Sequence, residues 1–126
     1  MKTSHKLACA ALALASLIGT ASSADAPAPS GREIFVLNCQ ACHGGTAPAD
    51  LPIGPSLDGI IGKRAATQAD GVHSRAVIDS GIVWDRDSLR RFLAGPSREI
   101  PGTYMPVRIA NPAELESLLD YLESLR

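Results

Sequence analysis

The chain has 126 residues, of which 45% are hydrophobic and 20% are charged, and its formal net charge is −1. This length fits one globular domain, and the composition excludes disordered and fibrous proteins. Because 13 acidic residues outnumber the 12 basic ones, the charge also argues against a surface that binds nucleic acids or anionic membranes.

The first 24 residues have the layout of a secretory signal peptide. Lys2 and Lys6 precede an apolar run over residues 7–18, and small residues follow as far as Ala24. The run is short for a bilayer span, which takes about 20 residues. We therefore expect cleavage near Ala24 and export, to the periplasm or a similar compartment, of a soluble mature protein. An N-terminal membrane anchor that is never removed stays open as an alternative.

Residues 25–30 are rich in proline, alanine and serine, and predict a flexible N-terminal segment before the folded domain. A helix is predicted from Ser30, because Ser30 and Glu33 have the spacing of a capping box. We expect this helix to continue to the glycine pair at 44–45. The proline-rich stretch over residues 46–55 has no apolar period and predicts a loop.

Three further helices are predicted along the chain. Ser74 can cap one that ends at Gly81, and Asp85 can cap another that stops at the next glycine–proline pair. In the last helix Asn111 is the expected N-cap and Pro112 the first helical residue. Leucines then recur at helical spacing, at Leu115, Leu118, Leu119, Leu122 and Leu125. No strand-like alternation is found, so the predicted fold is all-α with four to five short helices.

Residues 39–43 read Cys-Gln-Ala-Cys-His, the sequence signature of covalent haem attachment. Two thiols three positions apart can each add to one vinyl group of a porphyrin, and His43 can then place its imidazole under the iron. A disulfide between Cys39 and Cys42 would suit an exported chain, but it gives no reason for His43. A zinc site would need two more ligands, and the mature chain offers only His73. We therefore predict one covalently bound haem c.

Met105 is the candidate for the second iron ligand. It is the only methionine left after the leader is removed, and it lies in a loop bounded by Pro101 and Pro106. Methionine more often fills gaps in a core, but a lone methionine in such a loop is better explained as a thioether ligand. His73 stays open as a rival. Ligation by His43 and Met105 would leave no open iron position, and the neutral sulfur would favour ferrous iron.

Four segments, in order, resemble the class I family of monohaem c-type cytochromes across residues 31–126. They cover residues 31–43, 54–62, 80–85 and 101–105. The resemblance implies the cytochrome c fold, wrapped around one haem, in a protein that transfers single electrons and has no catalytic residue and no small-molecule substrate. It also implies that the first and last helices cross, with Leu118 and Tyr121 against Gly31 and Phe35.

The resemblance implies roles for two more residues. The Pro55 carbonyl should accept a hydrogen bond from the ring of His43 and so select its tautomer. Trp84 should donate its indole N–H to a haem propionate, with simple core packing as the alternative. Mitochondrial members carry arginine and tyrosine at two positions where this chain has Lys63 and His73. The other propionate contacts, with Arg64 as a further candidate, therefore stay open.

The resemblance further implies that an exposed haem edge docks redox proteins, such as membrane or periplasmic oxidoreductases of a respiratory chain. After removal of the leader one lysine and nine arginines face 13 acidic residues, a net charge of about −3. We expect the basic contacts to come from Arg90, Arg91 and Arg98 instead of lysines. Two alternatives stay open: a cytochrome subunit held permanently in a periplasmic dehydrogenase or oxidase, and a gas sensor or peroxidase in which Met105 is displaced.

Overall fold

The computed structural model describes residues 27–44, 53–68 and 72–125, so the predicted leader and the loop over residues 45–52 lie outside the described part. Within it there are six helices: α1 (Gly31–Asn38), α2 (Gln40–His43), α3 (Arg75–Ser80), α4 (Arg86–Ala94), α5 (Pro96–Glu99) and α6 (Pro112–Ser124). The described residues form no strand, and an isolated bridge joins Arg64 to Val83. The predicted all-α class is confirmed.

The predicted helix starts are present. Ser30 accepts a hydrogen bond from the Glu33 backbone N–H, and the Glu33 carboxylate accepts one from the Ser30 N–H, which completes the capping box of α1. Such caps stabilise a helix because the first turn has N–H groups without helical partners. The same role is filled at α3, α4 and α6 by Ser74, Asp85 and Asn111.

Two helix boundaries differ from the prediction and raise the number of helices to six. The first helix is interrupted at Cys39, whose φ of −117° separates α1 from the short α2. Pro96 follows the end of α4 and also begins a second short helix, the four-residue α5. Proline suits this position since its missing N–H would have no helical acceptor there.

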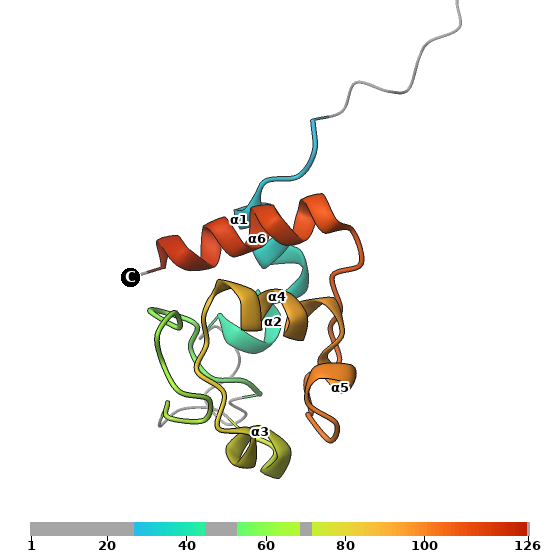
Figure 1. Ribbon diagram of the computed structural model, residues 1–126. Coiled ribbons are helices and arrows are strands. Elements are labelled where there is room, and N and C mark those ends of the chain that lie inside the picture. The colour runs from blue at the N-terminus through green and yellow to red at the C-terminus, as the bar shows by residue number, and fades with distance from the viewer. Residues whose placement is uncertain (1–26, 45–52, 69–71, 126) are drawn as a thin grey trace, which may run out of the picture.

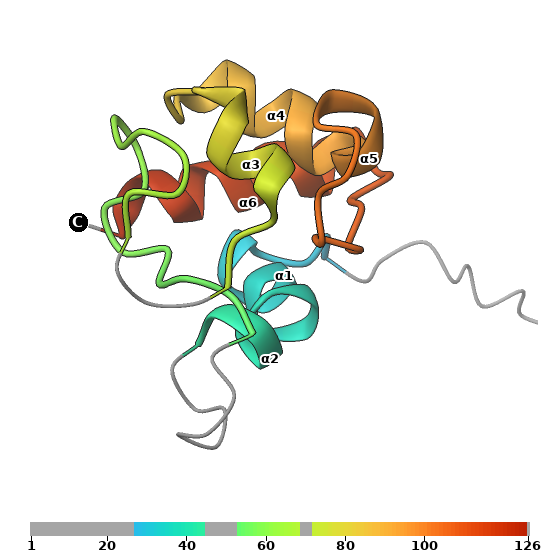
Figure 2. The ribbon, with the colours of Figure 1, turned by 90° about the horizontal axis from the view of Figure 1, so that it is seen from below.

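Helices α1 and α6 cross at close range (Figures 1 and 2). A Cβ atom on Gly31 would lie 1.9 Å from the backbone oxygen of Ser117, so only glycine fits at this position. One turn later the rings of Phe35 and Tyr121 pack with their centroids 5.3 Å apart. The predicted crossing of the first and last helices is therefore confirmed.

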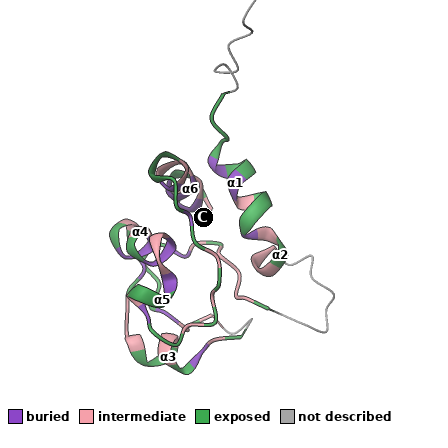
Figure 3. Ribbon diagram, turned by 90° about the vertical axis from the view of Figure 1, so that its right-hand side faces the viewer, coloured by how far each residue is buried: buried purple, intermediate pink, exposed green. Residues whose placement is uncertain are grey.

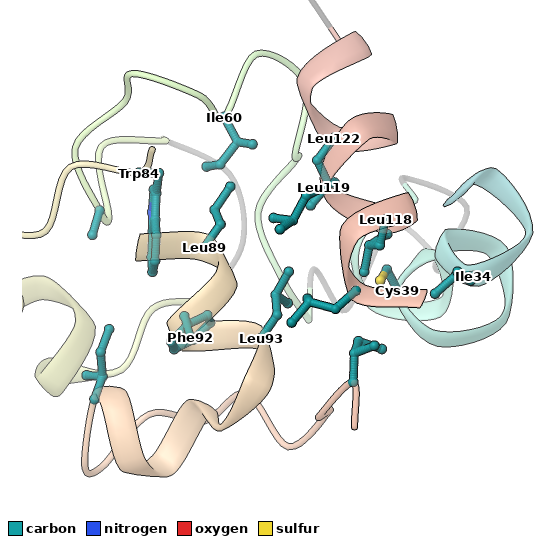
Figure 4. Close-up of a cluster of buried hydrophobic side chains, with 14 residues drawn as sticks. Ile34, Cys39, Ile60, Trp84, Leu89, Phe92, Leu93, Leu118, Leu119 and Leu122 are labelled. Carbon is teal, nitrogen blue, oxygen red and sulfur yellow. The ribbon is translucent and has the colours of Figure 1, made fainter. Parts of the chain in front are cut away.

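The buried core lies between α1, α4 and α6. Leu118 and Leu119 of α6 are 0% exposed, whereas α3 carries no buried residue (Figure 3). The side chains of α6 meet those of Leu89 and Leu93 from α4 in one cluster, to which Cys39 also belongs (Figure 4). On the outside, Arg86 of α4 forms ion pairs with three acidic residues of α6: Glu116, Asp120 and Glu123.

Individual backbone hydrogen bonds join the loops to these helices and to one another. The Gly59 N–H donates to the carbonyl of Leu125 just after α6, and the Trp84 N–H donates to the carbonyl of Lys63. The Ile109 N–H likewise donates to the carbonyl of Leu93 in α4. Among the described residues, no helix combines the length and the apolar character needed to cross a membrane.

Candidate functional site

A cavity of about 820 Å³, counted with its opening to solvent, lies among the helices and loops. Five of the six predicted site residues line it: Cys39, His43, Pro55, Trp84 and Met105. Much of the remaining wall is apolar and includes Leu89, Phe92 and Leu93 of α4. Cys42 is half-buried in α2 and is not among the lining residues.

The ring of His43 is held by a backbone carbonyl. Its Nδ1 atom lies 2.7 Å from the carbonyl oxygen of Pro55. Because a carbonyl can only accept, Nδ1 carries a proton and donates it, and in the neutral imidazole Nε2 then keeps its lone pair. The imidazole is therefore in the tautomer that can bind a metal ion through Nε2.

Gly54 allows the loop to approach this ring closely, which the sequence analysis did not foresee. A Cβ atom at this position would lie 2.6 Å from His43 Cε1. The Gly54 N–H also donates to the carbonyl of Cys42 at 3.1 Å, so the loop is attached to the end of α2. The Gly-Pro pair at 54–55 was the available sequence signal, because a glycine beside a functional residue often marks close backbone approach.

The two cysteines at the helix break have free thiols. The Cys39 side chain is 4% exposed, and burial, with a smaller contribution from neighbouring Cys42, raises the pKa of its thiol to about 11. Among the described residues no group of three or more histidine, cysteine, aspartate or glutamate side chains is placed to hold a metal ion, so the zinc alternative gains no support there.

Met105 follows a turn that places it in the cavity wall. The Thr103 N–H donates to the carbonyl of Ile100, and the Met105 N–H donates to Thr103 Oγ1 at 3.2 Å. Gly102 has a φ of +91°, and a Cβ atom there would lie 3.2 Å from Ala76 Cβ in α3. Met105 is half-buried against the core, whereas the neighbouring Tyr104 is 70% exposed.

The cytochrome c family model matches residues 28–126 of the chain. The chain belongs to the cytochrome c family. It is 37% identical over 102 residues to cytochrome c2 iso-2 of Magnetospirillum molischianum, covering 80% of this chain and all of that protein. It is 40% identical over 88 residues to cytochrome c2 of Agrobacterium tumefaciens, covering 67% of this chain and 79% of that protein.

A solved structure agrees with this assignment. Cytochrome cH from Methylobacterium extorquens superposes with a TM-score of 0.64 at 34% identity, covering 75% of this chain and 94% of that one. The predicted class I monohaem c-type cytochrome is confirmed, and with it one covalently attached haem c and a role in electron transfer between redox partners.

The cavity suits the haem of a cytochrome c. Its wall presents the buried Cys39 sulfur, the imidazole of His43 with Nε2 free, and the Met105 thioether, within a largely apolar surface. Trp84 is buried in the same wall, with its ring centroid 5.1 Å from that of Phe92. An apolar wall suits the flat face of a porphyrin, since apolar contact removes both surfaces from water.

The candidates for the propionate contacts differ in their position relative to the cavity. Lys63 and Arg64 are exposed and are not among the residues that line the cavity, whereas His73 is. The cavity wall also contains Gln68, which the sequence analysis did not single out. No sequence signal pointed to it, because a lone glutamine in a loop is usually solvated.

Two of the arginines expected to contact partners are already engaged with acidic residues. Arg90 pairs with Asp87 and Glu116, and Arg91 pairs with Glu99 at 2.8 Å. Their positive charges are therefore partly compensated within the cytochrome itself. The expectation of a docking contact consequently rests more on Arg98 than on Arg90 or Arg91.

Proposed function

We propose that this cytochrome is an exported carrier of single electrons whose haem iron is bound by His43 Nε2 and Met105 Sδ. The observation that carries the proposal is the hydrogen bond from His43 Nδ1 to the Pro55 carbonyl, 2.7 Å long, in a cavity that Met105 also lines. It leaves Nε2 as the lone-pair atom of the ring, and the Met105 thioether supplies a neutral sulfur ligand in the same wall.

The bound haem supplies an iron that changes between the ferrous and ferric states. The protein holds the ligands in place: the Pro55 carbonyl orients His43, and Thr103 holds the backbone of Met105. The buried side chains of Trp84 and Leu93 exclude water from the cavity wall. Because these groups are packed, little has to rearrange when the iron changes its charge, which suits electron transfer without a bound substrate.

Replacement of Met105 by alanine tests the ligand assignment. The ferric protein should lose the sulfur-to-iron charge-transfer band, and the reduction potential should fall by on the order of 0.1 V or more, because a neutral sulfur ligand favours ferrous iron. Val107→Ala is the matched control, since Val107 is half-buried on the same loop. A Met105→Ala protein with the band and potential of the wild type would exclude Met105 as the ligand.

Export is supported by the signal-peptide layout of residues 1–24. The full chain, expressed in a bacterium with haem-attachment machinery, should yield a red periplasmic protein whose N-terminus lies near Asp25. A chain without residues 1–24 should stay in the cytoplasm without covalent haem. Recovery of the uncleaved chain in the membrane fraction would instead support the permanent anchor.

A further inference from the structure

One polar side chain in the cavity wall lacks a hydrogen-bond partner. Among the described residues, the Nε2 atom of Gln68 is the buried side-chain nitrogen or oxygen that has no hydrogen-bond partner. A buried donor that has left water without gaining a partner costs free energy comparable to a lost hydrogen bond, so such groups are rare in native structures. An unpartnered donor beside a cofactor cavity therefore indicates an acceptor that the protein itself does not provide.

The backbone of Gln68 is fixed beside this cavity by a histidine. His73 Nε2 lies 3.3 Å from the Gln68 carbonyl oxygen, and because the carbonyl can only accept, Nε2 is the protonated nitrogen of this ring. Both residues line the cavity that also contains His43 and Met105. The terminal torsion of a glutamine is broad, so a small rotation can turn its N–H groups toward a group in the cavity.

The cationic side chains of the same loop are directed elsewhere. Lys63 Nζ donates to the carbonyl of Asp58 at 2.8 Å, outside the cavity wall. The Arg64 guanidinium lies next to Gly81, where a Cβ atom would be 3.3 Å from its Nη2 atom. Gln68 is therefore better placed than either cation to donate to an anion inside the cavity.

We propose that the Gln68 amide donates a hydrogen bond from Nε2 to a haem carboxylate, in place of a cationic side chain from this loop. The proposal rests on the function proposed above, because it requires haem in this cavity. An amide N–H₂ group needs an acceptor, and the carboxylates are the strongest acceptors that a haem carries. Because an amide is neutral, it holds the carboxylate without cancelling its negative charge.

Resonance Raman spectroscopy of the haem-loaded protein tests the contact directly. The haem carboxylate bending band reports hydrogen bonding to that carboxylate, so it should shift in Gln68→Leu, which keeps the bulk and removes the donor. Thr67→Val is the matched control on the same loop: its hydroxyl donates to the Arg64 carbonyl at 2.7 Å, and Thr67 does not line the cavity. The control should leave the band in place.

The charge at position 68 provides a second test. Gln68→Lys should raise the reduction potential and Gln68→Glu should lower it, because a cation near the iron favours the ferrous state and an anion the ferric state. The same lysine at the exposed position 67 should change the potential less. Equal shifts from Gln68→Lys and Thr67→Lys would contradict the proposal.

These outcomes separate this inference from the proposed function. If Gln68→Leu retains covalent haem and the sulfur-to-iron band but leaves the carboxylate band unshifted, the Gln68 contact is wrong and the electron carrier stands. If the wild-type protein lacks the sulfur-to-iron band, the ligand assignment fails whatever happens at position 68.

Discussion

The helices α1, α4 and α6 and the loops around the cavity are stabilised by different means. The helices share a continuous buried core in which Leu118 and Leu119 have no exposed surface, and ion pairs join α4 to α6 on the outside. The loops over residues 53–68 and 100–111 contribute fewer buried side chains to this core, and single backbone hydrogen bonds and glycines with positive φ also hold them in place. Stability is therefore concentrated in the helices, whereas the residues proposed to bind the iron lie in the short α2 after the helix break and in a loop.

Gly31→Ala should have the largest effect on global stability. The added Cβ would lie 1.9 Å from the Ser117 oxygen and 2.8 Å from Tyr121 Cβ, so α1 must move away from α6. We expect a loss of about 3 kcal/mol or more in the free energy of unfolding, measured by denaturant titration of the haem-loaded protein. Gly62→Ala, where a Cβ would meet nothing within 4 Å, should cost about 1 kcal/mol through its positive φ alone. Equal losses of unfolding free energy in Gly31→Ala and Gly62→Ala would refute the contrast between helices and loops.

Gly102→Ala should act mainly on the iron site. An alanine would be strained there, because φ is +91° and its Cβ atom would lie 3.2 Å from Ala76 Cβ. A local cost of about 1–2 kcal/mol should weaken the methionine ligand, so the sulfur-to-iron band should fade on warming well below the unfolding temperature. The control is Gly59→Ala, which also has a positive φ but lies on a different loop. Fading of the band to the same extent in both variants would contradict a local effect.

Ser30→Ala should have a moderate effect confined to stability. It removes the hydroxyl that accepts from the Glu33 N–H at the start of α1. The expected loss is about 1 kcal/mol in the free energy of unfolding, with the reduction potential unchanged. Ser97→Ala is a suitable control, because Ser97 is exposed and its hydroxyl forms no hydrogen bond within the part of the chain that the structure describes. A shifted potential in Ser30→Ala would show that the helices and the iron site are coupled.

The smallest effect should come from the ion pairs between α4 and α6. Hydrogen bonds from Arg90 and then Arg86 lower the pKa of Glu116 to about 2. Since the folded state lowers this pKa, the pair stabilises the protein at pH above the ordinary carboxylate pKa, and the contribution is lost as pH falls from about 4.5 toward 2. Glu116→Gln should flatten the fall of the unfolding temperature over that range. Glu114→Gln is the control: it removes a carboxylate that accepts a hydrogen bond from Asn111, and the unfolding temperature should fall with pH as steeply as in the wild type.

Local rules were sufficient for most helix starts. The cap of α1 depends on a serine and a glutamate three residues apart, and that of α6 on Asn111 followed by proline, so both follow from the nearest neighbours in the sequence. The motif over residues 39–43 identified the cofactor for the same reason, since its chemistry requires adjacent residues. Pairing between distant segments, as in the crossing of α1 and α6, followed only from the resemblance to a known family.

The remaining features depend on contacts that the local sequence does not encode. The interruption at Cys39 coincides with burial of that side chain in the hydrophobic core, which the sequence of α1 alone does not reveal. The role of Gly54 is defined by the nearby ring of His43, and that of Gln68 by its position on the cavity wall. Such residues can be recognised only when the packing partner is known.

The crossing of α1 and α6 also has a consequence for the order of assembly. The two cysteines belong to the early part of the chain, whereas the helix that covers α1 is the last to be synthesised. In an exported chain, as proposed above, the thiols would leave the membrane channel before α6, and they would meet the attachment machinery before the fold is complete. We expect a chain truncated before Pro112 to acquire covalent haem without reaching a stable fold, and a colourless truncated product would show that attachment waits for the last helix.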